Sequence, residues 1–156
     1  MLSLCSSSAA AQIKDRVVAY VDNTAITLSE LQEKYAETIR TAPSVTREEV
    51  LGTMINRILM IREAIKILLQ SESEEALLKD YIDLKIRAFI RIGDDEMRSF
   101  YDLHSPDFAG KSLDEVRDDI EDILTEQKLN ERLREHIEEL RNNACVKMQL
   151  IQQNQE

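Results

Sequence analysis

The side chains that could carry chemistry in this chain are few and lie far apart in the sequence. The two histidines are His104 and His136, and neither has a cysteine or a second histidine at zinc-finger spacing. The run Asp94-Asp95-Glu96 lacks the spacing of a calcium-binding EF-hand loop. It is typical of acidic residues at the start of a helix, where they interact favourably with the helix dipole. The sequence therefore predicts no metal site and no cofactor.

The nucleophilic side chains also lack a catalytic context. Neither Ser105 nor Cys145 lies in the sequence pattern of a hydrolase nucleophile elbow or of a protease cysteine. Gly110-Lys111-Ser112 matches the end of a phosphate-binding loop, but the glycine that begins such a loop is missing. Nothing in these patterns supports catalytic turnover, so we expect a protein that is not an enzyme.

Composition narrows the classes of partner. The chain has 156 residues, of which 43% are apolar and 32% charged, with three glycines and two prolines, which is typical of a soluble, mostly helical protein. The net charge of -10 argues against binding to nucleic-acid phosphates and against adsorption to anionic lipid. No stretch is long and apolar enough to cross a membrane. We therefore expect no nucleic-acid partner and no membrane insertion.

The first twelve residues differ from the rest of the chain. They carry no charge, and Ala9-Ala10-Ala11 before Gln12 fits the cleavage site of a secretory signal peptide. No basic residue precedes the short apolar run, so residues 1–12 are interpreted as a signal-peptide remnant or as a disordered leader. The two cysteines are Cys5 and Cys145, and removal of the leader leaves only one, which rules out an intramolecular disulfide.

Strand and helix signals then follow in order from residue 13. Val17–Val21 and Ala25–Thr27 flank a turn and predict a β-hairpin. Thr27 and Glu30 form a capping box that begins a helix extending to about Arg40.

Three more helices are predicted before residue 105. Thr46 begins a helix that extends to about Leu69 and is apolar on two sides, so we expect it to be the central core helix. Ser73 begins a third helix that reaches Ile92, and a short fourth helix follows Gly93 and ends near His104.

The longest predicted helix begins at the capping box of Ser112 and Glu115 and ends near Asn143. Its apolar stripe moves by about a third of a turn along the helix. The first half carries Leu113, Val116, Ile120, Ile123 and Leu124, and the second half carries Leu129, Leu133, Ile137 and Leu140. We expect the second half to belong to the core. The first half either lies against the fourth helix or offers its stripe to another chain, for example in a homodimer through this helix.

The alternating segment from Ala144 to Leu150 predicts a strand directly after the long helix. An isolated strand is not stable, so it must pair with the N-terminal hairpin. The expected fold is mainly α, with a small sheet formed by that hairpin and the C-terminal strand. We interpret residues 13–156 as one domain, with an N-terminal part at 13–104 and a closing helix and strand at 112–151.

The order of these elements resembles the N-terminal chaperone module of the SurA-type periplasmic chaperones and their PpiC-like relatives. The resemblance extends from Arg16 to Met148. It depends on the segments A-I-T-L-S-E-L after the hairpin turn, V-L-G-T-M-I-N-R-I-L-M-I-R-E-A in the long apolar helix, and L-N-E-R-L-R-E-H-I-E-E-L-R-N-N-A-C-V-K-M at the end. It implies an ATP-independent holdase that binds unfolded secreted or outer-membrane proteins in the periplasm.

The chain departs from that family at one point. The relatives usually carry parvulin-type prolyl isomerase domains inside the module, whereas the segment from Tyr101 to Ser112 has only twelve residues, too few for a domain. The resemblance thus implies the chaperone function without the isomerase. Two alternatives are a dedicated interaction or assembly subunit with one partner, and a non-catalytic remnant of a prolyl isomerase.

Large or flexible apolar side chains could line a groove for unfolded polypeptide clients, as they do in other promiscuous binding surfaces. Core packing is the alternative for each of them. The predicted client-binding residues are Met54, Met60, Ile67, Ile86, Ile90, Met97, Tyr101, Leu113, Val116 and Ile120.

Overall fold

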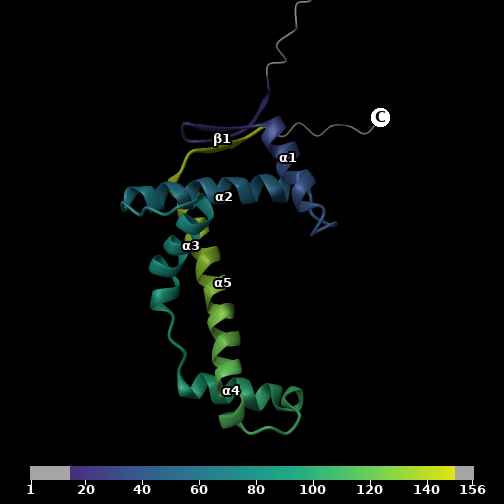
Figure 1. The fold of residues 1–156 in the computed structure, drawn as a ribbon, viewed down its shortest axis with the longest axis vertical. Helices are drawn as coiled ribbons and strands as arrows, with labels where there is room; N and C mark the ends of the chain where they lie inside the picture. Colours follow the sequence, from purple (N-terminus) through teal and green to yellow (C-terminus); the bar gives the residue numbers. More distant parts are fainter. Residues whose placement is uncertain (1–14, 150–156) are drawn as a thin grey trace, which may run out of the picture. The chain divides into compact units, whose positions relative to one another are not determined.

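The computed structural model describes residues 15–149, so the predicted leader at residues 1–12 and the end of the closing segment lie outside the described residues. The described part contains five α-helices and a three-stranded antiparallel sheet, which confirms the mainly α prediction (Figure 1). The chain divides into two compact units. Within the described residues, the first consists of 15–51 and 146–149, and the second of 52–145. The interpretation of residues 13–156 as one domain stays a prediction.

The sheet of the first unit is closed by the C-terminal strand. β1 (Val17–Val21) pairs antiparallel with β2 (Thr24–Thr27) on one side and with β3 (Val146–Met148) on the other, in the order β2-β1-β3. The Gln149 N–H extends this pairing by donating to the Val18 carbonyl at 2.7 Å. The predicted hairpin and its pairing with a C-terminal strand are thus confirmed.

Local capping begins the helices of the first unit as the sequence predicts. At the start of α1 (Leu28–Thr38), the Glu30 N–H donates to the Thr27 hydroxyl and the Glu30 carboxylate accepts from the Thr27 N–H at 2.7 Å. The same reciprocal pair joins Thr46 and Glu49 at the start of α2 (Arg47–Lys66). Each pair satisfies backbone donors that a helix start leaves open.

The end of α2 differs from the prediction. The helix stops at Lys66, because Leu68 adopts a left-handed backbone with φ 61°. The Leu69 N–H then donates to the Ala64 carbonyl and the Leu68 N–H to the Ile65 carbonyl, which is the bonding pattern of a Schellman motif. The Leu68 side chain is 85% exposed there, so the predicted apolar stripe ends before it.

Replacement of Leu68 by glycine should stabilise the protein. A left-handed backbone costs a residue with a Cβ about 1–2 kcal/mol, and the greater freedom of glycine in the unfolded chain offsets part of this gain. We expect Leu68→Gly to raise the free energy of unfolding in urea by about 0.5–1 kcal/mol. The control Leu68→Ala removes the same exposed side chain but keeps the strain, so it should leave the midpoint nearly unchanged. Equal midpoints for the two variants would contradict the strain.

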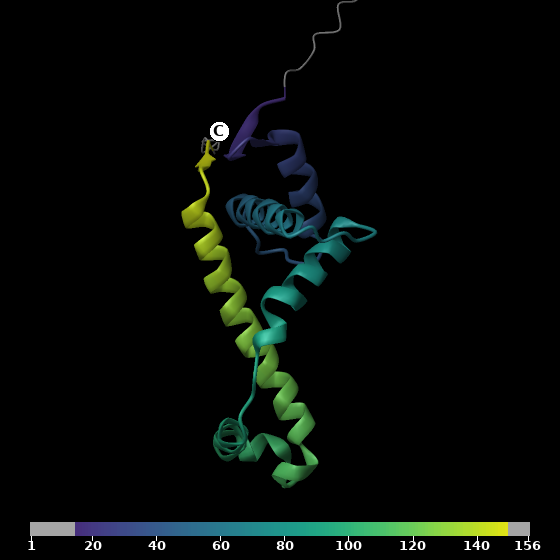
Figure 2. The same cartoon turned by 90° about the vertical axis from the view of Figure 1, so that its left-hand side faces the viewer.

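The third helix is shorter than predicted. α3 (Glu74–Lys85) begins at Ser73, whose hydroxyl accepts from the Ala76 N–H, and it ends where Ile86 leaves helical geometry at φ −124° and ψ −62°. A 3-10 turn, η1 (Arg87–Phe89), follows, and the chain is extended at Ile90 before α4 (Figure 2). The prediction of one helix reaching Ile92 is therefore wrong. The run that it assigned to a helix face instead makes an irregular connection.

The long helix begins five residues later than expected. After α4 (Asp94–His104) come two 3-10 turns, η2 (Ser105–Phe108) and η3 (Leu113–Glu115), and then α5 (Arg117–Asn143). The predicted capping box is present, since the Glu115 carboxylate accepts from the Ser112 N–H at 2.7 Å. It caps η3 rather than the α-helix itself.

Two separate apolar clusters in the second unit pack on α5. One has Met60, Ala64, Leu77 and Tyr81 at its centre, and the second half of α5 adds Leu133, Ile137 and Leu140. The other has Met97 from α4 together with Val116, Ile120 and Leu124. The predicted change of face along the long helix is thus confirmed. Most of the stripe of its first half packs beside Met97 of α4, whereas Ile123 of the same stripe is exposed.

Candidate functional site

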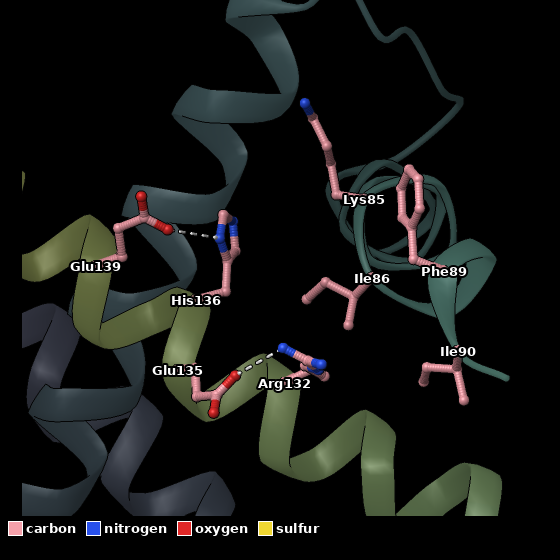
Figure 3. Close-up of a pocket in the computed structure, with 8 residues that line it drawn as sticks. All are labelled: Lys85, Ile86, Phe89, Ile90, Arg132, Glu135, His136 and Glu139. Atoms are coloured by element: carbon pink, nitrogen blue, oxygen red, sulfur yellow. Dashed lines mark hydrogen bonds and ion pairs between the residues drawn. The ribbon is translucent and has the colours of Figure 1, made fainter. Parts of the chain in front are cut away.

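A groove lies between the connection that follows α3 and one face of α5. Two cavities of about 400 Å³ and 290 Å³ share four lining residues, which makes them one continuous feature. One wall is formed by residues 85–91 and the other by α5 between residues 128 and 139 (Figure 3). This feature is called the groove below.

The wall at residues 85–91 carries three large apolar side chains because α3 ends early, with Lys85 and Arg91 at its two ends. Ile86 is buried and points from the end of α3 toward α5 (Figure 3). The 3-10 turn that follows leaves Phe89 76% exposed, with the half-buried Ile90 beside it. A continued helix would have placed these side chains at helical spacing instead. The break thus gathers three large apolar residues along one side of the groove.

The wall on α5 is charged and ordered by the helix repeat. Residues four apart lie on one helix face, and two such rows line the groove. The basic row is Lys128, Arg132 and His136, and the acidic row is Glu131, Glu135 and Glu139. The rows pair with each other, as the Arg132 and Glu135 side chains are 3.3 Å apart. The large apolar side chains of the groove therefore lie on one side, and the α5 side is lined by charged and polar residues alone.

Lys128 fixes one end of the groove. Its Nζ donates to the Glu96 carboxylate of α4 at 2.6 Å and to the Arg91 carbonyl at 2.9 Å. Both walls and the first turn of α4 are thus held by a single ammonium group. Arg87 adds a second tie, because its guanidinium donates to Glu126 of α5 at 2.8 Å. Charge-assisted bonds of this kind position the walls relative to each other.

A buried tyrosine supports the other part of the groove from behind. The Tyr81 Oη and His136 Nε2 atoms lie 2.7 Å apart, while the Glu139 carboxylate is 3.8 Å from His136 Nδ1. A neutral imidazole with its proton on Nδ1 suits both contacts. Burial raises the pKa of Tyr81 to about 12, and the nearby carboxylates of Glu63 and Glu139 add to this effect. Tyr81 therefore stays protonated and can donate to His136, which fixes the ring at the groove.

The groove places charged side chains of α5 opposite three large apolar ones. Within residues 15–149, no three histidine, cysteine, aspartate or glutamate side chains are grouped to hold a metal ion. No helix in the same range has the length and hydropathy needed to span a bilayer. His104 is stacked on Phe100, and its Nδ1 lies 3.3 Å from the Asp107 carboxylate. It belongs to a different helix from His136. The groove offers apolar contact area with charged groups opposite it.

The structure brings only two of the ten predicted client-binding residues into the groove, namely Ile86 and Ile90. Four are buried in the two apolar clusters: Met60, Met97, Val116 and Ile120. Tyr101 and Leu113 are half-buried against the second cluster, Met54 is half-buried in α2, and Ile67 is exposed after α2.

The rest of the groove is not among the predicted site residues. Phe89 falls within the predicted helix that reaches Ile92, and the charged residues of α5 carry no predicted role. The alternating charge rows at a spacing of four were the signal that could have identified the α5 wall. Comparison of the chain with protein-family models finds no match, and comparison with curated proteins finds none either. The resemblance to SurA-type modules thus stays a prediction, and the argument for function depends on the groove.

The raised pKa of Tyr81 makes a prediction for stability at high pH. A group with a higher pKa in the folded state contributes stability that is complete below its unfolded pKa and is lost as the pH rises through the folded value. For Tyr81 this window extends from about pH 10 to about pH 12. The variant Tyr81→Phe keeps the ring but cannot ionise.

We therefore expect the free energy of unfolding of the wild type to fall by about 2–3 kcal/mol relative to that of Tyr81→Phe across that window. Urea unfolding of both proteins at half-unit pH steps measures this difference, and the variant serves as the control for every other group that titrates there. A difference that stays constant from pH 9 to pH 12 would show that Tyr81 is not shielded in the folded state.

Proposed function

We propose that this protein is an ATP-independent chaperone that holds unfolded polypeptides by binding extended segments in the groove. The observation that supports this most directly is the apolar wall of Ile86, Phe89 and Ile90, in which Phe89 remains largely exposed. Burial of a large aromatic side chain on binding is favourable, and the side chain of Phe89 is available for it beside the cavity.

The dimensions of the groove suit an extended chain. Its α5 wall spans eleven residue steps from Lys128 to Glu139, or about 16 Å at 1.5 Å per residue. A strand rises about 3.3 Å per residue, so about five residues of an extended segment fit along it. Successive side chains of such a segment point in opposite directions. One set can contact the apolar wall while the other set faces the charged rows.

The expected affinity is that of a holdase. Burial of one large apolar side chain contributes about 1.5–3 kcal/mol, and ordering of the bound segment opposes this gain. Contacts of this size give weak and reversible binding to many sequences. Other exposed apolar side chains, among them Ile65 and Leu84, offer further contacts to a long client. The resemblance to SurA-type modules supports placing this activity in the periplasm, with unfolded secreted or outer-membrane proteins as clients.

A pair of serine substitutions tests the groove. Phe89 and Leu103 are exposed to 76% and 77%, but only Phe89 lines the groove. We expect Phe89→Ser to weaken binding of an extended aromatic peptide by about fivefold or more, since it removes a contact worth ~1 kcal/mol or above. Leu103→Ser should leave it unchanged. Fluorescence anisotropy measures the affinity of each protein for the peptide. Light scattering measures how far each protein suppresses aggregation of an unfolded β-barrel client at a near-stoichiometric ratio.

An equal loss of peptide binding in Phe89→Ser and Leu103→Ser would contradict a binding site in the groove. Absence of any suppression or peptide binding by the wild type would exclude the holdase itself. Capture of a single tight partner from a periplasmic extract, with indifference to generic clients, would favour a dedicated assembly subunit instead.

A further inference from the structure

The negative charge of the chain is concentrated in one part of the second unit. Residues 94–122 contain eleven aspartates and glutamates but only three lysines and arginines, which gives -8 of the total net charge of -10 with histidine neutral. This stretch comprises α4, the two 3-10 turns and the start of α5, and it packs around the cluster of Met97 and Ile120. It is called the acidic lobe below.

The groove leads to the acidic lobe at its Lys128 end. Lys128 lines the groove and also holds Glu96, which belongs to the lobe, at 2.6 Å. At about 100° per residue, Glu121 lies on the same face of α5 as Lys128, and Asp118 lies on the same face as His136. Both carboxylates are exposed. The α5 face that forms the groove wall thus continues toward the lobe with two exposed carboxylates, while Arg117 on the same face is bound to Asp94.

Two of the cations on the α5 wall are paired, since Lys128 is bonded to Glu96 and Arg132 lies 3.3 Å from Glu135. The lining as a whole has four lysines and arginines and three glutamates: Lys85, Arg91, Lys128, Arg132, Glu131, Glu135 and Glu139. The groove itself therefore carries no excess of negative charge that would attract a basic segment. The electrostatic preference of the site comes from the acidic lobe beyond the groove, where carboxylates greatly outnumber cations.

We propose that the groove selects extended segments in which an apolar stretch is flanked on one side by basic residues. The apolar residues lie against Ile86, Phe89 and Ile90, and the basic residues lie on the acidic lobe past Lys128. This inference rests on the proposed function, since it specifies which polypeptides the groove prefers. The lobe also steers cationic segments toward the groove, because a surface of one sign raises the local concentration of ligands of the opposite sign.

Three synthetic peptides test the preference. They share one apolar core of five residues and differ in a three-residue flank of lysine, serine or glutamate. At low salt we expect the lysine peptide to bind about three- to tenfold more tightly than the serine peptide, since exposed ion pairs are individually weak but add over three residues. The glutamate peptide should bind more weakly than both. Raising the salt to 0.5 M should bring the three affinities together, because screening removes the exposed electrostatic contribution.

A matched pair of variants assigns the preference to the lobe. The lobe variant combines Asp118→Asn with Glu121→Gln, and the control combines Glu48→Gln with Glu33→Gln. All four side chains are exposed, Asp118 and Glu48 both lie in the first turn of a helix, and both variants change the net charge from -10 to -8. We expect the lobe variant to lose at least half of the lysine preference and the control to retain it, with the serine peptide bound equally by both.

The outcomes separate the two proposals. Equal binding of the lysine and serine peptides, or equal loss in the lobe and control variants, would overturn this inference and leave the holdase intact. Failure of all three peptides to bind would overturn the proposed function and this inference with it. Tighter binding of the glutamate peptide would reverse the assigned charge preference and so overturn the inference alone.

Discussion

The second unit depends on one constraint, which is that α5 must bury two apolar faces that point in different directions. Leu133, Ile137 and Leu140 pack beside Tyr81, whereas Val116, Ile120 and Leu124 pack beside Met97. A single straight partner helix cannot cover both faces. The chain therefore supplies two short partners, α3 and α4, and joins them by a connection that is not helical. The groove lies where that connection passes α5, so it follows from the change of face.

Polar ties hold this arrangement at defined points. Lys128 joins α5 to α4 and to the connection, and Arg87 joins the connection to Glu126. Farther along α5, the Arg141 guanidinium donates to the Asn56 side chain at 2.7 Å and to the Gly52 carbonyl at 3.1 Å, which ties the helix to α2. Exposed ion pairs contribute little stability each. Their role here is to set the positions of walls whose apolar packing supplies most of the free energy.

The sequence predicts well those features that depend on neighbouring residues. Capping boxes at Thr27, Thr46 and Ser112 need only a residue and its partner three positions on, and all three are present. The change of face along α5 was also readable, because it depends only on the helical repeat. The C-terminal strand followed from the instability of a lone strand.

The features that the sequence analysis missed depend on contacts between distant residues. The helix α3 ends at Ile86 although no glycine or proline lies near that residue. The break occurs because the chain must reach α4, and no residue near Ile86 signals this. Leu68 adopts a left-handed backbone, which is unfavourable for a residue with a Cβ. The exposure of Phe89 follows from the break after α3 and not from its spacing in the sequence.

Hydrogen–deuterium exchange on the intact chain, with and without a saturating apolar peptide, tests most directly the claim that the groove holds extended polypeptide. Amides of residues 86–93 lie outside α-helices and should exchange readily in the free protein. Bound peptide should slow exchange at 86–93 and leave the connection at 105–112 unchanged. Protection confined to 105–112, or no protection at 86–93 when binding is complete, would contradict the account.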